Sequence, residues 1–169
     1  MKNISSYIWI VPVFILIQVL ILNNIQFVSF INPLVYLVLI ITLPQDTERW
    51  FLLAFSFIIG ILLDLFEGNI GLNSSSLVFV SFLTPYLQRV IIPKNSIDEK
   101  DRLSLQVLGL KTFSLYALSI ILIHHSFLFL IDHFSNSGIL FLIFKILLSS
   151  IVTYLIILIF QLFAFKTTE

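Results

Sequence analysis

The sequence predicts an all-α integral membrane protein, a single domain over residues 1–169 that forms a bundle of six transmembrane helices. Three observations support this fold class. Hydrophobic residues make up 59% of the chain and charged residues only 11%, against about 25% charged residues in an ordinary soluble domain. The mean hydropathy is +1.11. Apolar runs of nearly spanning length also recur between clusters of polar residues, Pro and Gly, and we expect this surplus of apolar surface to face lipid.

The first predicted span covers residues 4–22, with Pro12 inside it and Asn23-Asn24 at its end. A spanning helix needs about 20 mostly apolar residues. This run is too long for the apolar core of a signal peptide, and it lacks a small-residue cleavage site. We therefore interpret it as a retained first helix.

The second predicted span, residues 28–43, is the weakest. Pro33 and Pro44 leave only Leu34 to Leu43 between them, which is too short to cross a bilayer alone. The span must borrow apolar residues that precede Pro33, and Pro33 then either kinks the helix or occupies its first turn.

The other predicted spans are clearer in the sequence. The fourth is expected to be broken by Pro85, and the sixth is long enough to tilt. A polar segment, residues 93–111, separates the fourth span from the fifth. The remaining spans cover residues 50–66, 77–92, 112–131 and 139–165.

The distribution of basic residues decides in favour of six spans. Lys and Arg in short loops favour the cytoplasmic side of a membrane. With six spans and a cytoplasmic N-terminus, eight of the nine basic residues lie in cytoplasmic segments and none lies in an external loop. Without the second span, the basic cluster at 89–111 would be external. We therefore predict cytoplasmic N- and C-termini and a cytoplasmic loop at 93–111. The eight residues are Lys2, Arg49, Arg89, Lys94, Lys100, Arg102, Lys111 and Lys166.

Charge and cysteine content exclude several functions. The formal net charge is zero, so no overall field attracts nucleic acid. The chain has no cysteine, which excludes disulfides, thiolate metal sites and thiol nucleophiles.

Two residues of the third span share a helical face. Gly60 and Asp64 are four residues apart, and this spacing places them above one another on a helix. A glycine lets a neighbouring helix approach closely. A carboxylate in a span normally faces protein or a watery cavity, because its exposure to lipid is costly. We favour this partnered role for Asp64 over a carboxylate that merely snorkels to the external surface, and we expect the face to pack on a neighbouring helix or on a partner's span.

The order and spacing of these residues resemble the rod shape-determining protein MreD family of bacterial membrane proteins. The length and the six-span layout also match that family over the whole chain, whereas the motif itself covers only about residues 32–87. The turn at residues 45–49 is less basic than is usual in the family. The residues that carry the resemblance are Pro33, Pro44, Gly60, Asp64, Gly68 and Gly71.

The resemblance implies a non-catalytic scaffold in the inner (cytoplasmic) membrane, within the elongasome that directs peptidoglycan synthesis and cell shape. It implies contacts with a single-span MreC-like protein, an actin-like MreB filament, and the wall polymerase and transpeptidase. In architecture the family also resembles the substrate-binding subunits of vitamin transporters. The alternative function is therefore that of a subunit that binds a vitamin-type small molecule for a membrane transporter.

A metal site in the fifth span is disfavoured. His124-His125 and Asp132-His133 carry groups that can bind a transition metal. Adjacent residues on a helix, however, point about 100° apart, and the second pair follows about two turns later. We interpret these residues as polar groups near a membrane interface.

Enzymatic chemistry is also disfavoured. The serines at 74–76 and 149–150 lack a Gly-x-Ser-x-Gly pattern, and serine is common in spans as a hydrogen-bonding link between helices. Asp64 has no second carboxylate in a neighbouring span with which to form an acid pair. We expect no enzyme activity, no cofactor and no metal.

Lys145 lies inside the sixth span. A charged amine there must either extend its chain to the surface or find an acidic partner. Asp132 and Glu67 are predicted at the same external level, but snorkelling is the simpler interpretation.

Overall fold

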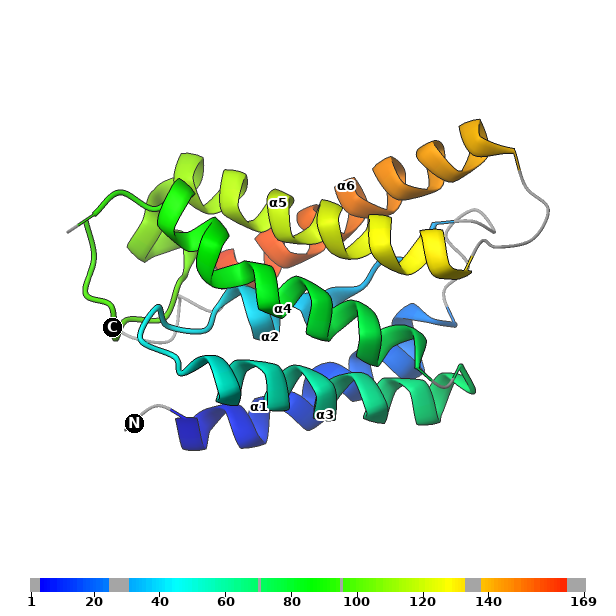
Figure 1. Ribbon diagram of the computed structural model, residues 1–169, viewed down its shortest axis with the longest axis horizontal. Coiled ribbons are helices and arrows are strands. Elements are labelled where there is room, and N and C mark those ends of the chain that lie inside the picture. Colours follow the sequence, from blue (N-terminus) through cyan, green and yellow to red (C-terminus); the bar gives the residue numbers. More distant parts are fainter. Residues whose placement is uncertain (1–3, 25–30, 70, 95, 133–137, 164–169) are drawn as a thin grey trace.

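The computed structural model describes residues 4–24, 31–69, 71–94, 96–132 and 138–163, with the backbone alone for residues 4–9. Within these ranges, every element of regular secondary structure is a helix. The long helices run roughly along the long axis of the molecule, and the connections between them gather at its two ends (Figure 1). The predicted all-α class is therefore confirmed for the described part of the chain.

The chain starts with α1 (Ile4–Leu16), which continues as the π-helical turn η1 (Ile17–Leu22). A non-helical stretch at residues 31–34 leads into the 3-10 turn η2 (Val35–Leu37) and the short α2 (Val38–Ile41). The long helices that follow are α3 (Arg49–Glu67), α4 (Leu72–Ile91), α5 (Leu105–Asp132) and α6 (Ile139–Phe163).

Three of the helices, α3, α5 and α6, are long and apolar enough to cross a membrane, and Ile10–Leu22 forms a shorter apolar helix. Their outer faces carry large exposed apolar side chains, among them Phe57, Leu115 and Phe144. Such a surface is unfavourable in water and is suited to lipid. The structure is therefore that of a helical membrane protein.

The centre of the bundle is the segment between the two prolines. All residues from Pro33 to Ile41 are buried, and Val35, Tyr36 and Leu37 have no exposed surface. The segment contacts α1, α5 and α6 through η2 and α2. It is the core on which the long helices pack.

The prediction of a helix over residues 28–43 is wrong in extent, because the described part of this range is helical only over residues 35–41. Asn32 precedes a proline, and the ring of that proline disfavours the helical conformation of the residue before it. Pro33 itself has no N–H to donate. Residues 28–30 lie outside the described residues.

Other boundaries also differ from the prediction. Helix α4 begins at Leu72 rather than Leu77, and it continues through Pro85 without a break. Helix α5 begins at Leu105, inside the predicted loop 93–111, and its regular geometry is interrupted at Gly109. The left-handed φ of 72° at Gly109 is one that glycine adopts without strain. Residues 164–165 of the sixth predicted span lie outside the described residues.

Successive long helices are neighbours. Helix α3 packs on α4, α4 on α5, and α5 on α6, while α1 and η1 lie against α3. Helix α1 starts, and helix α6 finishes, at the end of the molecule that also holds the α2–α3 and α4–α5 connections (Figure 1). The α3–α4 turn lies at the opposite end, where η1 also ends.

Candidate functional site

Helices α3 and α4 touch at Gly60. A Cβ atom built on Gly60 would lie 2.2 Å from the Cα atom and 2.7 Å from the backbone nitrogen of Ser74. Real Cβ atoms do not approach backbone atoms this closely, so only glycine fits here. The neighbour on the face of Gly60 is therefore α4 of the same chain.

Asp64 stabilises the start of α4. Its carboxylate accepts hydrogen bonds from the backbone N–H groups of Gly71, Asn73 and Ser74 at 3.0, 2.7 and 3.1 Å, and from Ser74 Oγ at 2.7 Å. The first N–H groups of a helix have no partner inside the helix, and a negative charge there also interacts favourably with the helix dipole. Asp64 is 2% exposed. Of the two interpretations of Asp64, the structure shows the partnered one.

Two glycines make the turn between α3 and α4 possible. Gly68 ends α3 with a φ of 73° and donates its N–H to the Asp64 carbonyl at 2.9 Å. Gly71 precedes α4 with a φ of 96°. Both values lie in the left-handed region that favours glycine. The turn thereby brings the first backbone N–H groups of α4 to the Asp64 side chain.

A second carboxylate extends this arrangement toward the first span. Glu67 accepts a hydrogen bond from Asn73 Nδ2 at 2.7 Å and another from Asn23 Nδ2 at 2.8 Å. Asn73 Oδ1 in turn accepts the phenolic hydrogen of the buried Tyr36 at 2.9 Å. We call Tyr36, Asp64, Glu67, Asn73 and Ser74 the turn cluster. It links the end of η1, the central segment, α3 and α4.

Gln18 of η1 supports the non-helical stretch. Its Nε2 donates to the Pro33 carbonyl at 3.0 Å and to Asn23 Oδ1 at 2.9 Å, and its Oε1 accepts the Val35 N–H at 2.9 Å. A backbone that is not helical needs such partners where no water is available. Gln18 has no exposed surface.

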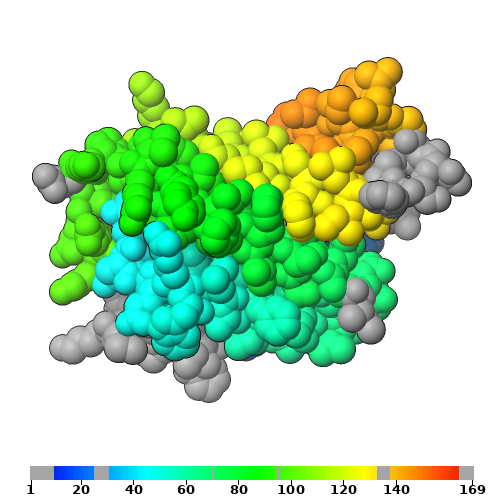
Figure 2. Space-filling model, in the orientation of Figure 1, coloured from blue at the N-terminus to red at the C-terminus, as the bar shows by residue number. Residues whose placement is uncertain are grey.

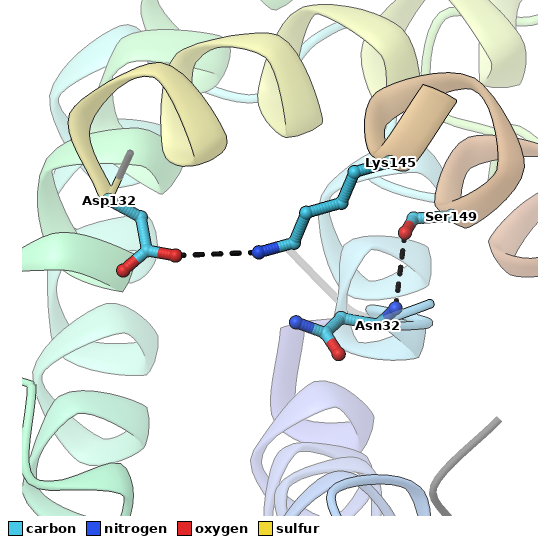
Figure 3. A network of polar contacts seen from close by, with 4 residues as sticks. All are labelled: Asn32, Asp132, Lys145 and Ser149. Atoms are coloured by element: carbon cyan, nitrogen blue, oxygen red, sulfur yellow. Dashed lines mark hydrogen bonds and ion pairs between the residues drawn. The ribbon is translucent and has the colours of Figure 1, made fainter. Parts of the chain in front are cut away.

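Two hydroxyl groups of α6 complete this support. Ser149 Oγ accepts the Asn32 N–H at 3.1 Å, and Thr153 Oγ1 accepts the Leu34 N–H at 3.0 Å. The first of these bonds is visible in Figure 3. Each backbone N–H from Asn32 to Val35 thus has a side-chain partner, apart from Pro33, which has no N–H.

Lys145 forms an ion pair with Asp132, with 3.5 Å between Nζ and Oδ2. Figure 3 shows the two side chains directed toward each other from α6 and the end of α5. The ammonium group also lies 4.3 Å from the ring centre of Phe129, a cation–π distance. The preferred prediction of a snorkelling Lys145 is therefore wrong, because α5 and α6 bring a carboxylate within its reach.

The two adjacent histidines are buried in α5. His125 Nδ1 lies 2.9 Å from the Ile121 carbonyl, and its Nε2 lies 3.3 Å from Thr153 Oγ1. The His124 ring packs edge-on against Tyr36, and neither of its nitrogens has a hydrogen-bond partner among the described residues. Asp132 is engaged with Lys145, and His133 lies outside the described residues. The four residues considered for a metal are thus not brought together where the structure describes them.

The six residues singled out in the sequence fall into three groups. Gly60, Asp64, Gly68 and Gly71 meet at the α3–α4 turn, whereas Pro33 lies in the central segment beside Gln18. Pro44 lies at the opposite end of that segment, where its carbonyl accepts hydrogen bonds from the N–H and the hydroxyl of Thr47.

The sequence patterns did not identify Gln18, Tyr36 and Asn73 as members of one hydrogen-bond network. A polar residue inside an apolar span is normally partnered, and this signal was present at Gln18.

The hydrogen bonds of the turn cluster join helices of this chain. A carboxylate has about four lone-pair sites, and the four donors on Asp64 fill them. Comparisons of the chain with protein-family models, with curated proteins and with solved structures find no match.

Proposed function

We propose that the protein is a non-catalytic scaffold of the MreD type, which holds together the membrane components of cell-wall elongation in the bacterial inner membrane. Its partners are then a single-span MreC-like protein, an MreB-like filament, and the wall polymerase and transpeptidase. The resemblance of residues 32–87 to that family is the basis of the proposal. The observation that favours it is the turn cluster, whose carboxylates are engaged in joining helices of this chain.

We also propose that the chain crosses the membrane six times with both termini in the cytoplasm. The doubtful second crossing is supported by geometry. Four non-helical residues, a 3-10 turn and a short α-helix over residues 31–41 can reach at most roughly 25 Å, whereas an α-helix of the same length reaches about 16 Å. The hydrocarbon core of a bilayer is about 30 Å thick. A partly extended chain can thus cross with fewer residues.

The basic residues support the orientation. Arg49 starts α3, Arg89 lies in the last turn of α4, and Lys94 and Lys100 follow in the α4–α5 connection. These elements meet at one end of the molecule (Figure 1). Positively charged loops are retained on the cytoplasmic side, so this end is assigned to the cytoplasm.

Reporter fusions test this topology. A periplasm-dependent reporter should be active when it is fused after Asn69 and within residues 132–138, and inactive after Asp98 and Glu169. A cytoplasm-dependent reporter at the same four positions serves as the control and should give the opposite pattern. An active periplasmic reporter at Glu169 would contradict the six-span topology.

Partner recovery tests the scaffold itself. The tagged protein, purified in mild detergent, should retain the single-span protein and the wall enzymes when the sample is analysed by mass spectrometry. An unrelated multi-span protein with the same tag is the control for detergent-stable contaminants. Recovery of transporter ATPases or a stoichiometric vitamin in place of the wall enzymes would favour the transporter alternative and refute the scaffold.

A further inference from the structure

A polar cavity of about 750 Å³ lies at the end of the molecule that is opposite to the turn cluster. It is open on one side and is lined by the residues that lead into α3, the last turns of α4 and the segment that follows α4. In Figure 2 the cyan residues before α3 lie against the green residues at the end of α4. The lining includes Gln45, Thr47, Arg49, Gln88, Arg89 and Lys94.

The charge of the cavity is positive. Its lining contains three basic residues, Arg49, Arg89 and Lys94, and one acidic residue, Glu99. Among the described residues, no carboxylate lies within 4.0 Å of any of these three cations. The amide of Gln45 adds N–H groups that can donate hydrogen bonds. The Gln88 amide donates one N–H to Tyr116 Oη at 3.1 Å and has a second N–H to donate. The cavity therefore offers to an anion three cations that form no ion pair among the described residues, together with neutral amide donors.

The aromatic residues next to the cavity indicate its depth in the membrane. Trp50 is 65% exposed and Tyr86 is 45% exposed, and the Arg49 guanidinium lies 5.6 Å from the Tyr86 ring centre. Exposed Trp and Tyr side chains of membrane proteins gather at the level of the lipid headgroups. The cavity thus lies where phosphate groups of lipids are concentrated.

We propose that this cavity binds a phosphate-bearing anion, with the headgroup of an anionic phospholipid as its source. Arginine forms paired hydrogen bonds with phosphate oxygens, and lysine contributes a point charge. The volume lies within the range of small-molecule sites, about 300–1,000 Å³, and it accommodates a headgroup with its glycerol. The site rests on the assignment of the chain to a membrane and is independent of the scaffold function.

Thermal unfolding of the purified full-length protein in neutral detergent measures the binding. Addition of phosphatidylglycerol should raise the Tm in a saturable manner, whereas phosphatidylcholine should not. Inorganic phosphate, tested at the same ionic strength, distinguishes the two sources of the anion. Stabilisation by the lipid alone assigns a headgroup site, and equal stabilisation by inorganic phosphate assigns a free-phosphate site. Absence of stabilisation by either ligand overturns the proposal.

Charge variants locate the site. The double variant Arg89→Gln and Lys94→Gln should raise the half-saturating lipid concentration about tenfold or more, because it removes two contacts with a charged ligand. The double variant Lys100→Gln and Lys111→Gln removes the same charge from exposed positions outside the cavity and should leave the half-saturating concentration unchanged. An equal effect of the two double variants would show that general surface charge, rather than this cavity, attracts the lipid.

Glu99→Gln provides a test by gain of binding. This change removes the carboxylate of the cavity wall, so the half-saturating lipid concentration should fall. A misfolded variant cannot produce this result. Unchanged or weaker binding by a folded Glu99→Gln protein would argue against an anion in the cavity.

Discussion

Gly60→Leu is expected to prevent accumulation of the folded protein. The first added carbon already lies 2.2 Å from the Ser74 Cα atom, and both atoms belong to helices that cannot yield locally. The helices must separate, which removes the close van der Waals contact that holds membrane helices together. Even Gly60→Ala should lower the free energy of unfolding by about 1–3 kcal/mol, the usual range for overpacking.

Protein yield and thermal unfolding in mild detergent measure this effect. Gly138→Ala is the matched control, because within the described part of the chain a Cβ built on Gly138 meets no neighbouring atom within 4 Å. Gly138→Ala should behave like the unmodified protein. Normal stability of Gly60→Ala would show that α3 and α4 are farther apart in the membrane than in this structure.

Asp64 variants should give a graded loss at the same contact. Asp64→Asn keeps one carbonyl oxygen but turns an NH2 group toward a donor, whereas Asp64→Leu leaves all four donors without their acceptor. Each buried donor without a partner costs about 1–3 kcal/mol. We therefore expect Asp64→Leu to be as severe as Gly60→Leu and Asp64→Asn to be milder, both in stability and in partner recovery. Asp101→Leu, at an exposed position, is the control. Normal stability and normal partner recovery in all the Asp64 and Gly60 variants would contradict a role for the helix face that carries these two residues.

Gln18→Leu should also destabilise the protein strongly. Leucine keeps the approximate volume of the side chain but leaves the Pro33 carbonyl and the Val35 N–H without their partner. The expected loss is about 1–3 kcal/mol for each group. Gln18→Glu keeps an acceptor for the Val35 N–H but has no amide N–H to donate to the Pro33 carbonyl. If its carboxylate keeps the Val35 hydrogen bond, the loss of unfolding free energy should be smaller than that of Gln18→Leu.

Thermal unfolding and the rate of proteolysis in detergent measure the change. Gln106→Leu is the matched control, since Gln106 is exposed on the first turn of α5. A Gln18→Leu protein as stable as this control would mean that water or detergent replaces the lost hydrogen bonds and that the central segment is accessible to solvent.

Features that depend on local spacing were predictable from the sequence. The four-residue spacing of Gly60 and Asp64 placed both on one face, and the energetic cost of a carboxylate in lipid required a partner for Asp64. Pro33 and Pro44 marked a segment too short for an ordinary spanning helix. The family resemblance, the orientation and the cellular role stay predictions.

Features that depend on contacts between distant residues were not predictable. The chain separates Gln18 from Val35, Tyr36 from Asn73, and Asp132 from Lys145 by enough residues that no periodic pattern links them. The non-helical stretch before η2 was missed for the same reason, because its N–H groups are satisfied by Ser149 and Thr153 of the last helix. Hydropathy registers the apolar character of a segment, but not which distant side chains replace its backbone hydrogen bonds.

The hydrogen bonds from α6 to the non-helical stretch impose an order on biogenesis. Asn32 and Ser149 are 117 residues apart in the chain, and Leu34 and Thr153 are 119 residues apart. During synthesis, this stretch leaves the ribosome long before Ser149 and Thr153 exist, whereas Gln18, which also supports it, precedes it in the chain. Contacts of such long sequence separation form late in folding. We therefore expect this stretch to reach its final place after α6 has been inserted, and we expect a chain truncated before α6 to leave the Asn32 and Leu34 N–H groups without these partners.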